Sequence, residues 1–524
     1  MTRRVVVVGG GITGLSAAYR LLHPVDARTA VPTVVLIDSA ERLGGKICTS
    51  AFDGRMVDEG ADAFLLRVPW ARELCEELGI GAERISPAVG GASLVHRGAR
   101  GPQLTSLPDG LVGGVPTRLR PLLRSPLLGP VGKLRAAADY VLPSRYTARR
   151  SAPARVEAGR ADPAQVGAVS VGELVASRLG AAVASSVVDP LLGSIGAGAI
   201  SRLDAATSAP ILVDALAHSR SLMRGLRRLQ PASPPWHRSG AAAASPAPIF
   251  GSFETGMGRL VDALTARLDD CDMRLGTPVE AIRSSGAQLA VDTGSEAGSE
   301  TGSEVFTADA VVVAVPAHAA AQMLPGAPTA AAELARIEYA SVAVITLSAR
   351  CEAIETPTEA GFLVTRDTGW LTTACSYGSA KWPSWSGAGA PTAVLRVSVG
   401  RDDDDRHTRL DDAALRDAVL TELSSLAPLR GLRDPGAVTA WRVSRWAQSL
   451  PQYRPGHGRL VERIDSALSR ELPGVFVTGA AHRGLGIPAC IRQGNEAAAA
   501  VVAHLGLDRS AGPPGALRPA HDSP

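Results

Sequence analysis

The sequence predicts an α/β fold in which one parallel sheet is assembled from both ends and the middle of the chain. Four short segments are apolar and β-branched, as buried parallel strands are: 4–8, 33–38, 309–315 and 474–479. A glycine-rich turn follows the first segment and opens a helix over 12–22. If the four strands share one sheet, the long stretches between them must form inserted domains.

The composition sets limits on the class of protein. The chain has 524 residues, 45% of them hydrophobic, which suffices for two or three domains. Its 54 basic and 51 acidic residues give no reason to expect a nucleic acid partner. The six cysteines lack zinc-site spacing, so no metal is expected, and scattered thiols favour a cytoplasmic location. No apolar run reaches the ~18 residues of a membrane span, which leaves at most peripheral membrane contact.

The glycine turn has the pattern of a dinucleotide-binding motif. Residues 9–14 read GGGITG and match GxGxxG between a buried strand and a helix. The glycines permit a tight turn, a close approach of the backbone to a pyrophosphate, and close packing of the helix on the strand. Asp38 ends the second strand, where a carboxylate accepts hydrogen bonds from ribose hydroxyls and disfavours NADP. A plain strand–helix turn and a solvent-facing Asp38 are the alternatives.

Three further segments distinguish FAD from NAD. The run `RLGGKI` places Gly44 and Gly45 after the second strand and resembles the GG-motif of the flavin-containing amine oxidase superfamily. The runs `GADAFL` and `GVFVTGAAHRGLGIPACIRQGNEAAAAV` resemble that superfamily's other flavin segments, in which a helix starting near Ile487 directs its dipole at the flavin. The residues assigned to FAD by the glycine motif and this resemblance are Gly9, Gly10, Gly11, Ile12, Thr13, Gly14, Asp38, Ser39, Arg42, Gly44, Gly45, Lys46, Gly60, Ala61, Asp62, Ala63, Val279, Ala480, Leu485, Gly486 and Ile487.

The middle of the chain indicates a narrower family. The runs `VVDPLLGSIGAG`, `SFETGMGRLVDAL` and `RWAQSLPQY` resemble the protoporphyrinogen/coproporphyrinogen oxidases of haem synthesis, over about 3–505. The resemblance implies FAD- and O₂-dependent six-electron oxidation of coproporphyrinogen III to coproporphyrin III with release of H₂O₂, and protoporphyrinogen IX is the alternative substrate. Another flavin oxidase of amines or polyenes, or a non-catalytic FAD-bound scaffold, are weaker rivals. The implied partners are the porphyrinogen, O₂ and the next enzyme of the pathway, ferrochelatase.

The resemblance also implies an arrangement of domains. An FAD-binding Rossmann-like domain would join an α+β substrate-binding domain that carries an inserted helical lobe. The expected segments are 1–65, 250–320 and 445–507 for the FAD-binding domain, 66–95, 211–249 and 321–444 for the substrate-binding domain, 96–210 for the lobe, and 508–524 for a disordered tail.

Substrate contacts are expected from cations, because coproporphyrinogen carries four propionates. Arg67 follows the flavin segment, and His482 and Arg483 lie in the loop before the flavin-facing helix. Gly196 stands where related sequences carry an aromatic residue, so it would widen the cavity. The alternatives are a surface arginine and a solvent-facing loop. No catalytic triad or carboxylate pair is found, so catalytic residues stay unassigned, and the four aspartates at 402–405 are interpreted as a solvated loop or helix start.

Overall fold

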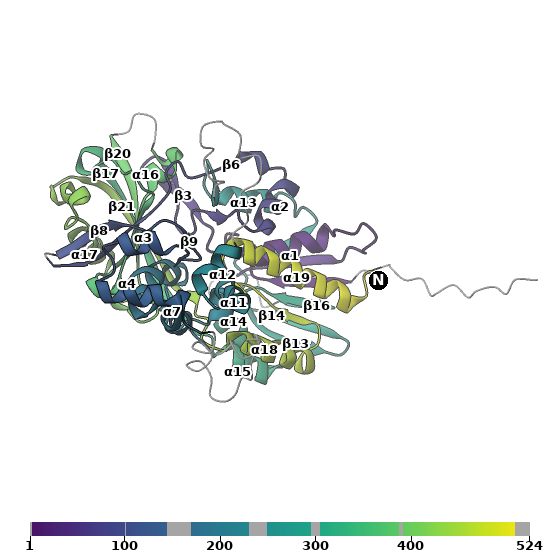
Figure 1. The fold of residues 1–524 in the computed structure, drawn as a ribbon. Helices are drawn as coiled ribbons and strands as arrows, with labels where there is room; N and C mark the ends of the chain where they lie inside the picture. The colour runs from purple at the N-terminus through teal and green to yellow at the C-terminus, as the bar shows by residue number, and fades with distance from the viewer. Residues whose placement is uncertain are drawn as a thin grey trace, which may run out of the picture.

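The computed structural model describes residues 3–99, 101–143, 169–229, 249–294, 304–386 and 391–508. These residues form a nucleotide domain, a large sheet domain and a helical lobe (Figure 1). Apart from Asp508, the expected disordered tail lies outside the described residues.

The nucleotide domain is built on the parallel sheet that the sequence predicts. Its strand order is β12-β2-β1-β16-β22. The bounds are β12 (Cys271–Arg274), β2 (Thr33–Ile37), β1 (Arg4–Val8), β16 (Ala310–Val313) and β22 (Val475–Val477). Side chains alternate across a strand, so the buried valines of β1 enter two different cores. This explains why every residue of the run `VVVV` is apolar.

Helices cover both faces of this sheet. Val5 and Val7 pack toward α1 (Ile12–Leu22), α13 (Gly258–Thr265) and α19 (Ile487–Leu505). Val6 and Val8 face the opposite core, which is closed by α14 (Ala317–Gln322), α15 (Pro328–Leu334), α18 (His457–Glu471) and the antiparallel sheet of β13 (Val279–Ser285), β14 (Gln288–Thr293) and β15 (Val305–Ala308).

Short elements connect the nucleotide domain to the rest of the molecule. The hairpin of β3 (Thr49–Phe52) and β4 (Arg55–Asp58) follows the second glycine pair. It is succeeded by β5 (Phe64–Leu65), α2 (Pro69–Glu77) and β6 (Arg84–Ile85), and both β5 and β6 pair with β11 (Phe250–Phe253).

The sheet domain contains seven strands in the order β21-β17-β20-β19-β18-β7-β8. Their bounds are β21 (Val438–Pro451), β17 (Tyr339–Arg350), β20 (Thr392–Val399), β19 (Thr372–Tyr377), β18 (Gly361–Val364), β7 (Ser93–Gly98) and β8 (Gly101–Ser106). The pairs are antiparallel except for β18 with β7. The apolar face of α17 (Asp412–Leu423) packs on this sheet.

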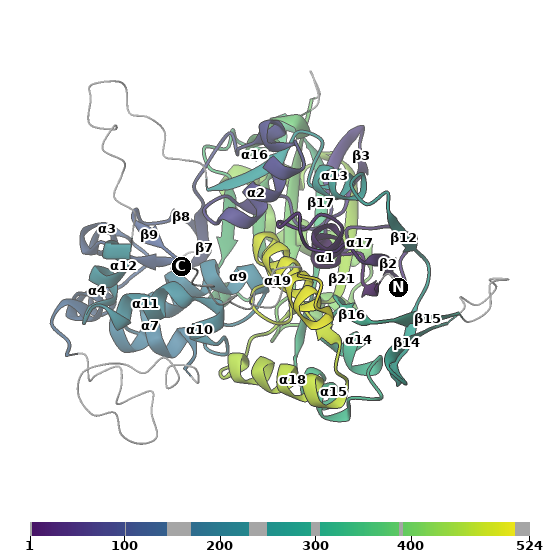
Figure 2. The same ribbon diagram turned by 90° about the vertical axis from the view of Figure 1, so that its right-hand side faces the viewer.

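The lobe is helical and has its own core (Figure 2). Its elements are the hairpin β9 (Leu111–Val112) and β10 (Val115–Pro116), and α3 (Leu119–Arg124), α4 (Pro130–Ala137), α7 (Val171–Leu179), α8 (Ala181–Val183), the π-helix η3 (Ala184–Gly193), α9 (Ser194–Gly196), α10 (Ala205–Ser208), α11 (Pro210–Ala217) and α12 (Leu222–Leu229). Pro190 lies within η3 and has no N–H to donate, which suits a widened helical turn. Inside the lobe Arg178 and Asp139 form a fully buried ion pair at 2.9 Å.

The expected span of the lobe is 96–210, but in the structure its elements run from β9 to α12, so both expected ends are wrong. Residues 101–106 form β8 and pair with β7, so they belong to the seven-stranded sheet. Helices α11 and α12 bury Leu212 and Leu226 in the lobe core, so the lobe extends to residue 229. Among the described residues, no helix is both long and apolar enough to cross a bilayer.

Candidate functional site

The first glycine turn brings the backbone of β1 and α1 into close contact. Gly9 has a φ of +108°, and a Cβ there would lie 2.8 Å from the Ala314 carbonyl oxygen. A Cβ on Gly14 would lie 1.8 Å from the Gly9 carbonyl oxygen, so only glycine lets the helix reach the strand. Gly11 is different, because its Cβ would meet nothing within 4 Å. It is the N-cap of α1 and no side chain caps that helix, which leaves first-turn N–H groups free for a ligand.

The second glycine pair lies against the first. The Gly44 N–H donates to the Gly10 carbonyl at 2.8 Å, and a Cβ on Gly45 would lie 3.4 Å from Gly11 Cα. Arg42 braces this turn by donating from Nη2 to the Gly45 carbonyl at 2.7 Å. Two glycine turns distant in sequence therefore lie in contact, and a side chain on Gly11 would project into open space beside them.

Asp38 lies beside this space at the carboxyl end of β2. Its carboxylate accepts from the Gly10 N–H at 2.5 Å and from the Ala40 N–H at 2.7 Å. These two backbone donors fix the position of the side chain. Ser39 next to it is exposed, and Val279 is buried at the start of β13.

The start of α19 is a second helix end without a side-chain cap. Gly486 is its N-cap, and the preceding loop is held by side chains from elsewhere. Gln493 donates from Nε2 to the Gly484 carbonyl at 2.9 Å. The Tyr453 hydroxyl accepts from the Gly484 N–H at 3.1 Å and donates to the Ala480 carbonyl. The helix and its leading loop thus present free backbone donors from a fixed position.

Lys46 is a charged group that is crowded by protein. Its side chain is exposed, yet the surrounding atoms desolvate the ammonium and lower its pKa. Cys490 on α19 is close enough to act on that charge, although burial raises the pKa of its thiol. Lys46 also acts on His318, whose pKa is lowered by burial and by the ammonium. No carboxylate of the described residues acts on the pKa of Lys46, so its ammonium would be stabilised by an anionic ligand nearby.

The segment 60–63 joins the glycine turns to the sheet domain. A Cβ on Gly60 would lie 2.1 Å from the Lys46 carbonyl oxygen. Asp62 accepts from Lys381 Nζ at 2.7 Å, and Arg396 Nη1 lies 3.5 Å from the same oxygen. Burial opposes ionisation, but Lys381 and Arg396 hold the pKa of Asp62 far below its usual range. The carboxylate is therefore committed to the sheet domain, and Ala61 and Ala63 beside it are half-buried.

The four residues expected to meet the substrate have different surroundings. Gly196 lies opposite the loop of α19, since a Cβ there would meet only Leu485, at 3.4 Å. Arg67 is exposed and has no ion pair or hydrogen bond within the described part of the chain. Arg483 forms an exposed ion pair with Asp465 at 2.9 Å.

His482 is buried, and within the described ranges neither ring nitrogen has a partner. Burial, followed by the charges of His457 and Arg483, lowers its pKa to about 3. The ring is therefore neutral at physiological pH and lacks the positive charge expected of it. Of the four residues, Gly196 is the one that lies against the FAD-assigned loop.

Several residues around this site were not identified from the sequence. Tyr453 and Gln493 both lie in runs that resemble the family, but nothing local marks either of them as a brace of the loop before α19. From the sequence, the four aspartates at 402–405 are interpreted as solvated, and for Asp402 this interpretation is wrong. Its side chain is 1% exposed and pairs with Arg454 at 2.8 Å and Arg202 at 3.2 Å. Those two partners are distant in sequence, so the run itself carried no signal of the burial.

The geometry fits a dinucleotide. The open position at Gly11, the uncapped start of α1 and the fixed Asp38 carboxylate match a pyrophosphate and a ribose. The second glycine turn and the uncapped start of α19 extend the same site toward the sheet domain and the lobe. Fold and site together define a dinucleotide-binding protein with a Rossmann-like nucleotide domain.

Known proteins resemble the chain over almost its whole length. A family model described as flavin containing amine oxidoreductase matches residues 12–502. A coproporphyrinogen III oxidase of Bacillus subtilis (strain 168) is 31% identical over 96% of this chain and 98% of its own. One of Mycobacterium tuberculosis (strain H37Rv) is 32% identical over 96% and 98%. A crystal structure from Exiguobacterium sp. 255-15, named as a protoporphyrinogen oxidase, has a TM-score of 0.76 at 27% identity and covers 96% of this chain and 99% of that one.

The chain belongs to the flavin-containing amine oxidoreductase family, within the group of the coproporphyrinogen III oxidases. Its cofactor is FAD, and the predicted α/β fold with a Rossmann-like FAD domain is confirmed.

Proposed function

We propose that the protein oxidises coproporphyrinogen III to coproporphyrin III. Six hydrogen atoms leave the macrocycle, and three O₂ molecules are reduced to three H₂O₂. The observation that carries the proposal is similarity over nearly the full chain, lobe and sheet domain included, to relatives named for this reaction. A likeness confined to the nucleotide domain would support only the cofactor.

The protein's own residues bind and orient. The uncapped start of α1 and Gly11 would hold the pyrophosphate of FAD, and Asp38 would accept from a ribose hydroxyl. The uncapped start of α19 would stabilise negative charge on the flavin ring. FAD, when bound, accepts two electrons per turn as a hydride, so three turns complete the oxidation.

The substrate would lie beside the contact between the loop before α19 and the lobe. Gly196 and Leu485 face each other there, and Tyr453 fixes the loop from the sheet side. His482 lies in this loop, buried and neutral, and supplies no charge, so we propose that Gly196, Leu485 and Tyr453 position the ring and exclude water. We propose Arg67 and Arg483 as further contacts for propionates, since both side chains are exposed.

The second candidate substrate is protoporphyrinogen IX, which the name of the Exiguobacterium structure favours. The test is a side-by-side measurement of kcat/KM for the two porphyrinogens, with anaerobic bleaching of the flavin as a direct readout. We expect coproporphyrinogen III to be the better substrate by at least about tenfold, a difference of ~1.4 kcal/mol. A preference for protoporphyrinogen IX would reverse the assignment, and flavin that stays oxidised with both would reject it.

We further propose that the reaction takes place in the cytoplasm and that ferrochelatase receives the product. The free thiols of all six cysteines support a reducing compartment. Co-purification of tagged protein with ferrochelatase tests the partnership, and recovery of the enzyme without ferrochelatase at physiological salt would contradict it.

A further inference from the structure

A cavity of about 100 Å³ lies between the lobe and the seven-stranded sheet. Its lobe wall is formed by η3 and the turn after α9, with Asp189, Gly193 and Ala197. Its sheet wall comes from β17, β18, β19, β20 and the end of β21. That wall is mostly apolar, with Val344, Val399 and Leu450, and includes two hydroxyl residues, Thr373 and Ser398. Arg366 and Arg401 are the two cations that line it. The cavity therefore combines largely apolar walls with two arginines and one carboxylate, that of Asp189.

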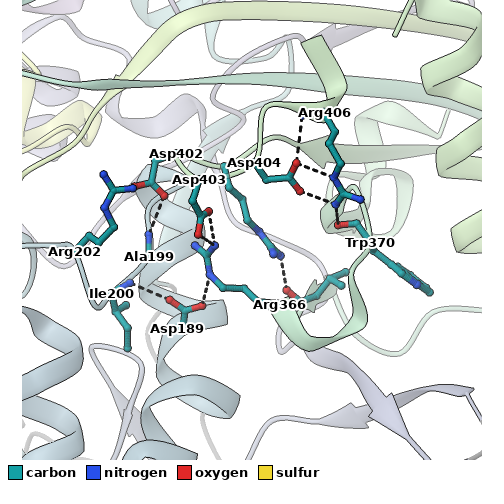
Figure 3. Close-up of polar contacts among 12 residues, drawn as sticks. Asp189, Ala199, Ile200, Arg202, Arg366, Trp370, Asp402, Asp403, Asp404 and Arg406 are labelled. Atoms are coloured by element: carbon teal, nitrogen blue, oxygen red, sulfur yellow. Dashed lines mark hydrogen bonds and ion pairs between the residues drawn. The ribbon is translucent and has the colours of Figure 1, made fainter. Parts of the chain in front are cut away.

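The two arginines differ in how their charge is balanced. Arg366 donates from Nε to Asp189 at 2.7 Å and from Nη1 to both oxygens of Asp403 at 2.5 and 2.7 Å (Figure 3). Although burial opposes it, these carboxylates raise the pKa of Arg366. Two acids thus neutralise this one guanidinium, which leaves Arg366 with little affinity for a further anion.

Arg401 has no such partner. Its side chain makes one hydrogen bond in the described part of the chain, from Nη2 to the Val364 carbonyl at 2.9 Å, and no ion pair within 4 Å. Burial and the charge of Arg366 lower its pKa, although Asp189, Asp403 and Asp404 oppose that shift. A guanidinium has five N–H donors, so most of those on Arg401 are free to face the cavity. Such a desolvated and unpaired cation is matched by a carboxylate, which guanidinium binds in a bidentate manner.

The size and position of the cavity limit the ligand. A water molecule needs on the order of 10–15 Å³ by the same measure, so the space takes a handful of heavy atoms and no macrocycle. Ala197, which lines the cavity, directly follows Gly196, which faces Leu485 of the FAD-assigned loop. A ring held against that loop would have to extend its arm past Ala197 to reach Arg401.

We propose that Arg401 binds the carboxylate of one propionate arm of the porphyrinogen, whose two methylenes lie against the valines of the sheet wall. This assignment rests on the proposed function for the identity of the ligand. Arg366 serves as a positioning residue, because its pairs with Asp189 and Asp403 hold the lobe wall and the loop of Arg401 together.

The experiment compares Arg401→Gln, Arg401→Lys and a matched control, Arg409→Gln, in the FAD-loaded full-length protein. Arg409 is also an arginine of this loop region, but its side chain is 74% exposed, and among the described residues it pairs only with Asp405. Two quantities are measured for each: the Kd for coproporphyrin III from fluorescence titration, and kcat and KM for coproporphyrinogen III. The flavin absorbance spectrum verifies that each variant is folded around its cofactor.

We expect Arg401→Gln to raise Kd and KM roughly 10- to 100-fold, the effect of losing a charge-assisted hydrogen bond in a desolvated site. Turnover at saturation should change little, Arg401→Lys should recover part of the affinity, and Arg409→Gln should match the wild type.

Equal Kd values for Arg401→Gln and Arg409→Gln would overturn the assignment of Arg401. The proposed function would still stand in that case if the wild-type protein oxidised coproporphyrinogen III. If Arg401→Gln failed to bind FAD, the test would rest on Arg401→Lys. A folded Arg401→Lys protein whose Kd and KM equal those of the wild type, at low and at high salt, would overturn the contact between Arg401 and the propionate. Wild-type protein that neither binds coproporphyrin III nor oxidises its porphyrinogen would instead remove the proposed function.

Discussion

Arg366 and Asp189 join the sheet domain to the lobe, with Nε and Oδ2 2.7 Å apart. The Asp189 side chain is 9% exposed, and its other oxygen accepts from the Ile200 N–H at 2.9 Å. We expect Asp189→Asn to keep the shape but lower the free energy of unfolding by about 1–3 kcal/mol, because it removes the charge from a hydrogen bond to a buried group. Urea denaturation of the FAD-loaded protein measures this.

The control for this prediction is Asp405→Asn, which removes the exposed pair with Arg409. Exposed ion pairs contribute about 0–1 kcal/mol, so this variant should unfold close to the wild type. Losses of the same size in the two variants would show that Asp189 has no special part in holding the lobe.

Gly11→Ala tests the cofactor site at a position where the protein itself has room. Gly11 and Gly129 are both helix N-caps with near-identical backbone angles, and a Cβ at either meets nothing within 4 Å. Both alanine variants should therefore lose similar, small amounts of helix stability in the FAD-free protein. Only Gly11→Ala should weaken FAD binding, by about tenfold or more, because the added methyl occupies space for the pyrophosphate. FAD titration of the flavin-free proteins gives the two affinities, and equal affinities would refute the placement.

His482 should make the protein sensitive to acid. Its pKa is lowered to about 3 in the folded protein, whereas an unfolded histidine titrates near ~6.5. Between these two pKa values the unfolded chain binds a proton at His482 and the folded protein does not. The contribution of His482 to the free energy of unfolding is therefore complete above pH 6.5 and is lost as the pH falls toward 3. We expect the wild type to lose about 2 kcal/mol relative to His482→Phe between pH 7 and pH 5. Denaturation curves at pH 7, 6 and 5 provide the test, and parallel pH profiles for the two proteins would contradict it.

Tyr453→Phe should loosen the loop that precedes α19. The hydroxyl binds the Gly484 N–H and the Ala480 carbonyl, and its loss leaves both groups without this partner. We expect a loss of about 1–3 kcal/mol in stability, together with a shifted flavin absorbance spectrum. Tyr377→Phe is the matched control, because this buried tyrosine makes no hydroxyl hydrogen bond among the described residues. An unchanged spectrum in Tyr453→Phe would argue against contact between this loop and the flavin.

The sequence predicts the nucleotide domain well because its signals are local. The run of valines in β1 must be buried on both faces, and glycine at 14 is required by a contact close by in the chain, with the Gly9 carbonyl oxygen. Gly9 is required locally by its φ of +108°, whereas its close contact is with the distant Ala314. Strand β12 was not predicted, because its run `CDMR` is short and mostly polar at a sheet edge. The limits of the lobe also could not be predicted, since β8 is assigned to the sheet only by its pairing with β7.

The charged residues around the cavity between the lobe and the sheet depend on partners that are distant in sequence. Their roles therefore could not be predicted from the sequence. Asp402 becomes buried because Arg202 and Arg454 reach it from other elements. Within the part of the chain that the structure describes, Arg401 differs from its charged neighbours in having no ion-pair partner. A sequence does not show which member of a charged run lacks such a partner. The π-helix that brings Asp189 to Arg366 has no sequence signature apart from Pro190.

The order of strands in the nucleotide sheet has a consequence during synthesis on the ribosome. β1 leaves the ribosome early, but its neighbour β16 and the edge strand β22 follow only about 300 and 470 residues later. Until then the sheet that carries the glycine turn lacks β16 and β22, and the valines of β1 are not fully packed. Long-range parallel pairing of this kind folds slowly and exposes apolar strands in the meantime. Because α19 and β22 come from the last part of the chain, the FAD-binding surface is complete only when translation is almost finished.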